Sequence, residues 1–336
     1  MIRRVEAENG SYDIHIGSGL LNEDIVNGEY AVVTDSNVAG LYAERFDADR
    51  MIVLEAGEQS KNLENLGNIL DRLLKMGLER GGIVVALGGG VVGDIAGFAA
   101  SVYRRGTGLV QVPTTLLSMV DSSVGGKTAI NLKEGKNMAG TFYQPQKVVI
   151  DTDTLKTLDE RQKAAGMAEV IKYAYIADAG LYLKLRENNF DTAGMIADCC
   201  SIKADYVKKD PYDKGVRMQL NYGHTIGHAI EAAAGYGNYL HGEAVAMGMV
   251  CAAKIGEKLG VSPRGLAQDT AMLVEKYGLR YEADVYVMKN AVELLANDKK
   301  SERGEISFIL IDSIGHAVVK KIETKLLANL ITEDIC

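Results

Sequence analysis

Three of the five histidines in this chain of 336 residues lie close together in the sequence, at positions 224, 228 and 241. His224 and His228 are four positions apart, so on a helix their imidazole rings project from the same face. The segment Gly235–Tyr239 is rich in glycine and can fold the next helix, which carries His241, back onto the first. Neutral imidazole is a preferred zinc ligand, and a catalytic zinc takes three protein ligands and leaves one position open. The spacing favours a metal or catalytic site over a structural histidine cluster.

Glu169 is the acidic residue best placed to complete this set. It stands on an otherwise apolar helical stretch, three positions before Lys172. A carboxylate on a buried helix face requires a cation or a metal, so we expect Glu169 beside the histidines. Glu231 and Glu243 are expected to be supporting or surface groups. The segment is not the HExxH motif of zinc proteases, because no glutamate follows His224.

Several basic residues have contexts that suit an anion-binding pocket. Lys127 follows two glycines, and Arg217 stands four residues before Asn221 and seven before His224, a spacing that predicts one shared helix face. The net charge of −8 argues against a nucleic-acid surface but leaves room for a local basic pocket. The other members of this set are Arg105, Lys136 with Asn137, Lys172, Lys203 and the pair Lys299–Lys300.

A glycine-rich turn, GGGVVGD over residues 88–94, follows a predicted strand and matches the G-x-G-x-x-G fingerprint. Bare backbone N–H groups at the start of the following helix, expected over Asp94–Tyr103, can hold a pyrophosphate. The turn follows the third or fourth strand, and no acidic residue stands about 20 positions on, so the adenosine end of a dinucleotide must use other loops. Residues 121–128 resemble a P-loop, but its first glycine is replaced by Asp121, which excludes that interpretation.

Polar loops at the ends of successive predicted strands are the candidates for binding the adenosine end of a dinucleotide. They carry Asp35 with Asn37, Glu58 with Lys61, and Thr114 with Thr115. Ligands of open parallel sheets bind at the carboxyl ends of the strands, so these loops are expected to share one cofactor site.

The elements that must position these residues divide the chain in two. Apolar, β-branched runs at 30–34, 51–54, 82–87, 108–112 and 147–150, with a helix over 63–76 among them, predict a Rossmann-like parallel sheet with crossover helices. From about residue 155 helical periodicity dominates, and a short β pair is expected at 306–311 and 317–319. We expect an α/β domain over 1–150 and a mainly α-helical domain over 151–336, with the active site in the cleft between them.

Composition restricts the class of protein. No apolar run is long enough to cross a membrane, and the N-terminus carries no secretory signal. The four cysteines form neither a disulfide framework nor a CxxC metal motif, and Cys199–Cys200 is expected to pack on a helix. These features predict a cytoplasmic protein with no nucleic-acid or membrane partner.

Taken together, the motifs resemble the 3-dehydroquinate synthase family of sugar-phosphate cyclases. The matching strings run in order over nearly the whole chain: GGGVVGD (88–94), RG (105–106), QVPTTLL (111–117), VDSSVGGKT (120–128), GKN (135–137), AEVIK (168–172), LNYGHTIGH (220–228), HGEAV (241–245) and DKK (298–300).

The resemblance implies an NAD-dependent, zinc- or cobalt-dependent lyase of the shikimate pathway, which makes aromatic amino acids. Such an enzyme converts 3-deoxy-D-arabino-heptulosonate 7-phosphate, a small anionic sugar phosphate, to 3-dehydroquinate and phosphate. It works by transient oxidation, phosphate elimination, re-reduction and aldol closure. Residues 1–150 would bind NAD, and 151–336 would bind the metal and the substrate. Family members are homodimers, and Arg105 would act across the dimer interface.

The resemblance also implies site residues. The metal ligands would be Glu169, His224 and His241, one divalent ion per subunit, and His228 would transfer protons near the departing phosphate. Substrate contacts would fall on Arg105, Asp121, Lys127, Lys136, Asn137, Lys172, Lys203, Arg217, Asn221 and Lys299–Lys300. Cofactor contacts would fall on Asp35, Asn37, Glu58, Lys61, Gly90, Val91, Val92, Gly93, Asp94, Thr114, Thr115, Lys127, Lys136, Thr154, Leu155, Lys156 and Thr157.

One position departs from the family pattern: Asp213 stands four residues before Arg217, where the family usually has glutamate. Three alternatives stay open at this point. They are another cyclase, of the 2-deoxy-scyllo-inosose synthase type, an iron-type glycerol or alcohol dehydrogenase, and a non-catalytic NAD-binding module. The cluster of Lys203, Arg217 and Asn221 favours a substrate with a carboxylate, because a neutral sugar would leave this positive cluster unpaired.

Overall fold

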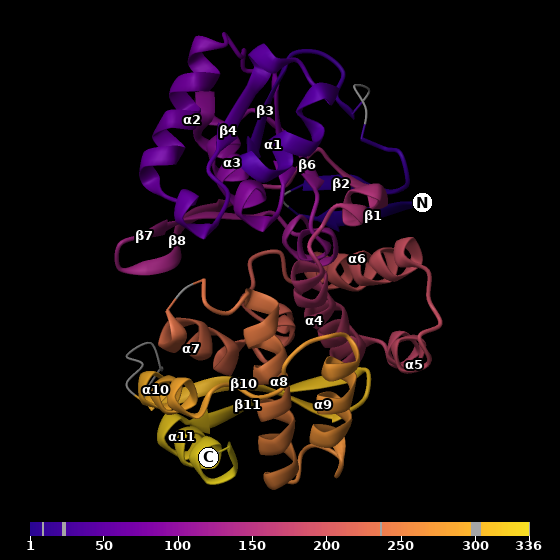
Figure 1. The fold of residues 1–336 in the computed structure, drawn as a ribbon, viewed down its shortest axis with the longest axis vertical. Coiled ribbons are helices and arrows are strands. Elements are labelled where there is room, and N and C mark those ends of the chain that lie inside the picture. Colours follow the sequence, from indigo (N-terminus) through magenta and orange to yellow (C-terminus); the bar gives the residue numbers. More distant parts are fainter. Residues whose placement is uncertain (9, 22–24, 236, 297–303, 336) are drawn as a thin grey trace. The chain divides into compact units, whose positions relative to one another are not determined.

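The computed structural model describes residues 1–8, 10–21, 25–235, 237–296 and 304–335 (Figure 1). The chain folds into two compact units, and each unit is built from two segments. The sheet unit holds residues 1–159 and 192–212, and the helical unit holds 160–191 and 213–336. The assignment of NAD binding to residues 1–150, and of metal and substrate binding to 151–336, stays a prediction.

The sheet unit contains a seven-stranded sheet in the order β1-β2-β9-β6-β5-β3-β4. Neighbouring strands are parallel throughout, apart from the antiparallel pair β1–β2 at one edge. The strands are β1 (Ile2–Ala7), β2 (Gly10–Gly17), β3 (Tyr30–Asp35), β4 (Met51–Leu54), β5 (Ile83–Gly88), β6 (Gly108–Pro113) and β9 (Lys147–Asp151). The five expected strands are all present, which confirms the parallel-sheet fold class.

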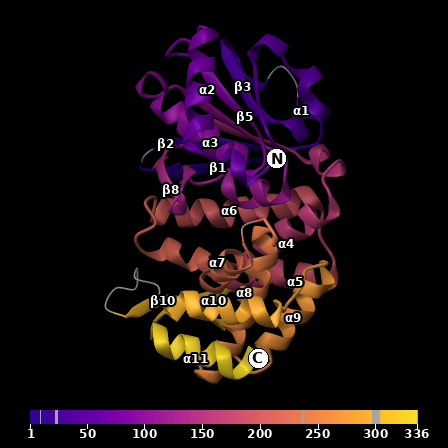
Figure 2. The same ribbon diagram turned by 60° about the vertical axis from the view of Figure 1, so that its left-hand side comes forward.

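Helices of the sheet unit cover both faces of this sheet. The α-helices are α1 (Ser36–Tyr42), α2 (Leu63–Lys75), α3 (Gly90–Val102) and α6 (Thr192–Lys209), and the short helices are η2 (Ala43–Arg45), η3 (Ala48–Arg50), η4 (Glu58–Ser60), η5 (Tyr103–Arg105), η6 (Ser118–Ser122) and η7 (Thr152–Lys156). Leu66, Ile69 and Leu73 form the buried stripe of α2, which packs with α3 on one face (Figures 1 and 2). The opposite face packs against Val38 of α1.

Strands β1 and β2, a β-hairpin and the place of helix α6 in the sheet unit were not expected. A hairpin of β7 (Lys127–Leu132) and β8 (Gly135–Phe142) follows η6. Helix α6 packs against β1 and η6, although it lies far from them in the sequence. Cys199 and Cys200 are fully buried on α6, which confirms the packing expected for this pair.

The helical unit is built around α8, which is buried along most of its length. Its elements are α4 (Glu160–Ala177), α5 (Ala179–Glu187), η8 (Val216–Asn221), α7 (His224–Ala234), α8 (His241–Lys258), α9 (Leu266–Lys276), α10 (Val285–Ala296), β10 (Glu305–Ser313), β11 (His316–Glu323) and α11 (Thr324–Ile335). The antiparallel pair β10–β11 confirms the short β pair expected near the C-terminus. Among the described residues, none of the helices combines the length and the apolar character needed to span a bilayer.

Two expectations about helix boundaries are wrong. Helix α3 begins at Gly90 rather than Asp94, so the glycine turn itself forms its first turn. Arg217 and Asn221 lie in the 3₁₀ helix η8 and do not share a helix face with His224. The chain breaks at Gly223, whose φ of +79° is left-handed. A Cβ at this position would also meet the carbonyl oxygen of Val245 at 2.8 Å, so only glycine fits here.

Candidate active site

Three helices of the helical unit bring Glu169, His224 and His241 together. Glu169 is fully buried on α4, while His224 and His241 are the first residues of α7 and α8. The Glu169 Oε1 atom lies 3.6 Å from His224 Nε2 and 3.7 Å from His241 Nε2. All three ligand atoms lie within 4.8 Å of one another, so the group can hold a metal ion.

The geometry of this group fits a tetrahedral ion. Ligand atoms about 2.1 Å from a tetrahedral zinc lie roughly 3.4 Å apart. The two distances from Glu169, 3.6 and 3.7 Å, are only slightly longer. Both Glu169 carboxylate oxygens are buried without a hydrogen-bond partner, although Lys172, one turn further along α4, forms an ion pair with Oε2. A buried carboxylate of this kind requires a strong ligand, and a divalent ion supplies one.

Hydrogen bonds to the other ring nitrogens orient the two histidines. His224 Nδ1 lies 3.1 Å from the Tyr222 carbonyl oxygen, and His241 Nδ1 lies 3.1 Å from Glu231 Oε2. Each Nδ1–H donates to its oxygen partner, which leaves Nε2 with its lone pair facing Glu169. Glu231 is thus the supporting group that was expected, and it is buried.

The electrostatics keep His224 neutral, as a metal ligand must be. Burial lowers the pKa of His224 well below its usual value of 6.5, and the nearby positive charge of Lys172 lowers it further. The hydrogen bond to the Tyr222 carbonyl opposes this shift but does not reverse it. A neutral imidazole has its lone pair available without first losing a proton.

Close contacts at glycines set the spacing of the three helices. A Cβ on Gly242, next to His241, would lie 1.9 Å from the Ala165 carbonyl oxygen of α4. A Cβ on Gly248 would lie 2.0 Å from the Gly223 carbonyl oxygen at the start of α7. Since backbone blocks both positions, only glycine lets α8 approach α4 and α7 this closely.

His228 lies one turn after His224 on α7 and is exposed. Its ring centroid is 5.5 Å from that of His224 and 5.6 Å from that of His241. The structure therefore brings all three histidines together, as their spacing predicts. A second possible group joins His228, Glu231 and His241, but there the His241 Nδ1 atom already bonds Glu231.

The glycine turn after β5 has the features of a phosphate-binding helix start. Gly89 is the N-cap of α3, and no side chain caps the helix and no acid lies in its first turn. A Cβ on Gly90 would meet Ser122 Oγ at 3.1 Å, and one on Gly93 would meet Gln111 Oε1 at 2.9 Å. Uncapped N–H groups at a helix N-terminus favour anions, so this turn suits a pyrophosphate.

The loops that follow β3, β5 and β6 all begin at the carboxyl ends of these parallel strands, on the same side of the sheet. β4 and β5 flank β3 on opposite sides, so the switch point of the sheet lies between β3 and β5. Asp35, at the end of β3, caps α1 by accepting from the N–H groups of Asn37 and Val38, both at 3.0 Å. Thr114 donates its N–H to the Gly88 carbonyl at 3.0 Å, which places the Thr114–Thr115 loop beside the glycine turn.

One connected network is formed by the predicted cofactor residues Glu58, Lys61, Asp94 and Lys136. Lys61 is 3% exposed and lies 2.6 Å from Asp94 Oδ2 and 3.8 Å from Glu58 Oε1. Glu58 also lies 4.0 Å from the Lys136 Nζ atom. Burial raises the pKa of the Asp94 carboxyl, while the charge of Lys61 and its hydrogen bond oppose that shift.

Asn131, which sequence reasoning missed, joins this network to the β7–β8 hairpin. It donates its N–H to the Lys61 carbonyl at 2.8 Å and its side-chain amide to Glu58 Oε1 at 2.8 Å. Its own Oδ1 atom accepts from the Asn137 N–H at 2.9 Å, and Asn137 has a φ of +59°. No local pattern marks Asn131, because its partners come from distant segments.

Lys203 of α6 pairs with Asp121 of η6. Its Nζ atom donates to the Asp121 carbonyl at 2.6 Å and forms an ion pair with the carboxylate. Lys203 is 6% exposed, so the packing of α6 carries a buried cation to the π-helical turn η6. Lys127, at the start of β7, and Arg105, which has a φ of +65°, are exposed.

The remaining predicted residues lie in three further places. Thr154, Leu155 and Lys156 lie in η7, and Thr157 follows it with its hydroxyl 2.6 Å from that of Tyr42 on α1. Arg217 is 2% exposed on η8, and Asn221, at the end of η8, is exposed. Lys299 and Lys300 lie outside the described residues.

Comparison with known proteins identifies relatives over nearly the full length. A family model described as 3-dehydroquinate synthase N-terminal matches residues 51–165, and one described as 3-dehydroquinate synthase C-terminal matches residues 166–301. A 3-dehydroquinate synthase of Acidithiobacillus ferrooxidans is 47% identical over 94% of this chain and 93% of its own. One from Alkaliphilus metalliredigens is 43% identical over 91% of each chain.

Solved structures with the same fold include two sugar-phosphate cyclases. A 2-deoxy-scyllo-inosose synthase complexed with carbaglucose-6-phosphate, NAD+ and Co2+ has a TM-score of 0.86 and 28% identity, covering 99% of this chain and 100% of that one. A 2-epi-5-epi-valiolone synthase from Streptomyces hygroscopicus with NAD+ and Zn2+ bound has a TM-score of 0.84 and 27% identity, covering 98% of each. A probable glycerol dehydrogenase from Sinorhizobium meliloti is 15% identical with a TM-score of 0.64 over 95% of each chain, a likeness of fold alone.

Proposed function

The chain belongs to the 3-dehydroquinate synthase family, and from that premise we propose how its residues divide the work of the reaction. The reaction converts 3-deoxy-D-arabino-heptulosonate 7-phosphate to 3-dehydroquinate and phosphate, with NAD and a divalent metal ion as cofactors. The observation that carries the proposal is the group formed by the buried Glu169 and His224 and the partly exposed His241. In this group the Nε2 atoms of both histidines face the carboxylate.

Glu169, His224 and His241 hold the metal ion. When bound, zinc or cobalt polarises a substrate hydroxyl or carbonyl oxygen as a Lewis acid. Glu231 fixes the ring of His241, and the Tyr222 carbonyl fixes that of His224. The protein thereby presents preformed ligands, so little conformational entropy is lost when the ion binds.

The loops at the carboxyl end of the sheet hold NAD. The uncapped start of α3 binds the pyrophosphate with its backbone N–H groups. Gly90 and Gly93 let Ser122 and Gln111 pack closely against this first turn. Asp35, Asn37, Thr114, Thr115 and the segment 154–157 are proposed to bind the rest of the cofactor. NAD bound there would supply a reversible hydride acceptor.

Buried cations bind the two anionic groups of the substrate. Lys172, Lys203 and Arg217 are 1%, 6% and 2% exposed, so they differ from solvated surface charges. A substrate with a carboxylate and a phosphate matches these cations in charge. Arg105, Asp121, Lys127, Lys136, Asn137, Asn221, Lys299 and Lys300 are proposed to complete the substrate contacts.

His228 is the proposed proton-transfer group. It stands one turn from His224 on α7 and, unlike the three ligands, is exposed to solvent. At a ring nitrogen, its imidazole takes up the proton that the substrate C–H next to the transient carbonyl loses as the C–O bond to phosphate breaks. It can then pass that proton to water. Because His228 is not one of the proposed ligands, its role separates from metal binding in an experiment.

A phosphate-release assay tests the proposed function. We expect release from the heptulosonate phosphate with NAD and Zn2+, loss of activity with a chelator, and recovery when metal is restored. Glucose 6-phosphate, a sugar phosphate without a carboxylate, is the matched control and should give far slower release. Protein that binds NAD and metal but releases no phosphate from the heptulosonate would refute the proposal.

Two alanine variants test the division among the histidines. His224→Ala should lose most bound metal, whereas His228→Ala should keep a full metal complement and lose about 10²–10⁴-fold in kcat, the range for general acid–base groups. Metal content by elemental analysis and kcat are measured on the same samples. Full metal occupancy in His224→Ala would overturn the ligand assignment.

We also propose a cytoplasmic homodimer in which Arg105 acts across the dimer interface, a proposal supported by the family relationship. Mixing Arg105→Ala subunits with His224→Ala subunits then creates one site with all its residues, so activity should return on mixing. If the mixture stays inactive while sedimentation shows mixed dimers, Arg105 does not act across the interface.

A further inference from the structure

One face of α4 contacts the start of α8 at three successive levels. Arg161, Ala165 and Glu169 are four residues apart on α4, so they share a face. Arg161 pairs with Glu243, Ala165 lies against Gly242, and Glu169 lies 3.7 Å from His241. Consecutive residues of α8 thus meet successive turns of α4. We call the contact of Arg161 with Glu243 the outer level, that of Ala165 with Gly242 the middle level, and that of Glu169 with His241 the metal level.

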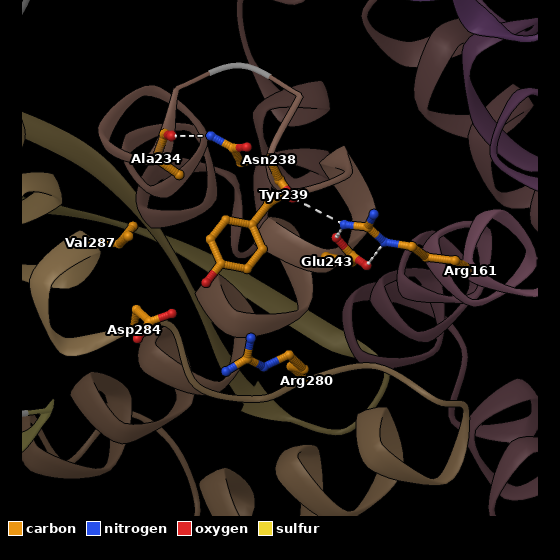
Figure 3. A pocket seen from close by; sticks show the side chains of 8 residues that line it. All are labelled: Arg161, Ala234, Asn238, Tyr239, Glu243, Arg280, Asp284 and Val287. Atoms are coloured by element: carbon orange, nitrogen blue, oxygen red, sulfur yellow. Dashed lines mark hydrogen bonds and ion pairs between the residues drawn. The ribbon is translucent and has the colours of Figure 1, made fainter.

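An ion pair closes the outer level. The Arg161 guanidinium binds both oxygens of the Glu243 carboxylate, with Nε at 2.6 Å from Oε1 and Nη2 at 2.8 Å from Oε2 (Figure 3). Nη2 also donates to the Asn238 carbonyl at 3.0 Å. A bidentate arginine–carboxylate pair fixes orientation as well as distance.

The same carboxylate holds the residue that precedes His241. Glu243 Oε2 accepts the Leu240 N–H at 2.8 Å, as in a capping box at the start of α8. Arg161 and Glu243 therefore restrain the chain on both sides of the His241 backbone. Asn238, whose side chain donates to the Ala234 carbonyl at 2.6 Å, ties the same connection to the end of α7.

The middle level leaves no room for adjustment. The position of a Cβ on Gly242 lies 1.9 Å from the Ala165 carbonyl oxygen, so the two backbones are already in close contact. A change in the angle of α8 about this contact moves Glu243 and His241 in opposite directions. The ion pair at one end is thus mechanically linked to the distance between His241 and Glu169 at the other.

We propose that Arg161 and Glu243 are positioning residues that hold His241 at the correct distance from Glu169 for the metal ion. The inference rests on the proposed function only in that it assigns the metal to Glu169, His224 and His241. Neither residue is a member of the metal group itself. Arg161 is about half exposed and Glu243 is largely buried, with side-chain exposures of 55% and 15%.

The exposure makes this inference testable apart from stability. Because Arg161 is about half exposed, losing the ion pair should lower the unfolding temperature only slightly. Bond lengths at a metal site, in contrast, tolerate only about 0.2 Å. We therefore expect the loss to appear in metal binding and not in the fold.

The test uses full-length protein stripped of metal and reloaded with Co2+, whose visible absorption reports the geometry of its ligands. Arg161→Gln and Glu243→Gln should change the intensity or position of the band and speed metal dissociation about tenfold, the lower end for groups that support ligands. Arg161→Lys keeps the positive charge but cannot bind both carboxylate oxygens at once. Its Co2+ spectrum and metal dissociation rate should therefore lie between those of Arg161→Gln and wild type.

Arg186→Gln is the matched control. Arg186 pairs with Asp269 in the same helical unit with similar exposures, 46% and 19%, but does not contact the 237–243 segment. Its Co2+ spectrum, metal dissociation and activity should match those of wild type. Circular dichroism and thermal unfolding confirm that all variants fold.

The outcomes separate this inference from the proposed function. Wild-type Co2+ spectra and dissociation rates in both Arg161→Gln and Glu243→Gln would overturn the positioning role, as would an equal change in Arg186→Gln. Neither readout needs substrate. A wild-type protein that binds Co2+ but releases no phosphate would refute the proposed function and leave this inference intact.

Discussion

Replacing Gly242 by alanine tests how tightly the contact between α4 and α8 controls the metal site. The added Cβ would stand 1.9 Å from the Ala165 carbonyl oxygen and 2.6 Å from its carbonyl carbon. Both neighbours are backbone atoms within a helix, so neither can rotate away. The helices must separate, because Cβ contacts shorter than 3.0 Å essentially never occur.

The size of the displacement follows from these distances. The start of α8 must move by at least 3.0 − 1.9 = 1.1 Å from the Ala165 oxygen. His241 is the adjacent residue, and the tolerance of a metal–ligand distance is about 0.2 Å. The variant should therefore lose most of its metal affinity. Overpacking should also lower the free energy of unfolding by about 3 kcal/mol, the upper end of the usual range, because backbone meets backbone.

The matched control is the same substitution at Gly67. This glycine is exposed within α2, and a Cβ there would meet nothing within 4 Å. Alanine has the higher helix propensity, so Gly67→Ala should raise the free energy of unfolding by about 0.5–1 kcal/mol. Metal titration and thermal unfolding of the metal-free proteins measure both effects. Wild-type metal affinity in Gly242→Ala, or a rise in its unfolding temperature, would refute the reasoning.

Three further predictions concern buried titratable groups. Lys61→Met should lower the free energy of unfolding by about 2–3 kcal/mol because it leaves Asp94 without its cation. Burial raises the pKa of Asp94, so the loss of unfolding free energy should grow as pH rises through that pKa. The double variant Lys61→Met/Asp94→Asn should recover most of the lost free energy. Urea titrations at pH 5 and pH 8 measure both effects. Because the pKa of His224 lies well below 6.5 in the folded protein, the metal-free chain should lose stability as pH falls below about 6.5, and a His224→Asn variant should lack that contribution. Burial raises the pKa values of Cys200 and Cys251 to about 12, so these thiols should resist alkylation in native protein at pH 8. Mass spectrometry measures the labelling, and labelling at the rate of a free thiol would contradict this prediction.

Local patterns in the sequence predict much of the sheet unit. The five runs of β-branched residues are strands because both faces of the sheet are covered, which makes each strand continuously apolar. Strand β2 escaped notice, although Tyr12, Ile14 and Ile16 alternate with polar residues and are all buried. The period of two that is typical of a half-buried strand is present there, although β2 lies between β1 and β9.

Tertiary contacts decide what the sequence alone could not. Helical spacing placed Arg217 on the same face as His224, but the chain breaks at Gly223, which packs against α8. The acid on an apolar helix predicted that Glu169 would lie beside the histidines, and the structure brings these residues together. Arg161 and Asn131 gave no comparable signal, because each owes its importance to partners from distant segments.

Because each unit is built from two segments of the chain, the parts of the two units are synthesised in a fixed, alternating order. The chain passes between units at residues 159–160, 191–192 and 212–213. A ribosome that has released residue 212 has made the whole sheet unit, but of the metal group only Glu169. The buried carboxylate must therefore wait for His224 and His241 during translation, with Lys172 as its only ion-pair partner on the same helix among the described residues. On the proposed ligand assignment, the site is complete only once His241 has been made, so we expect metal loading to be a late event of biogenesis.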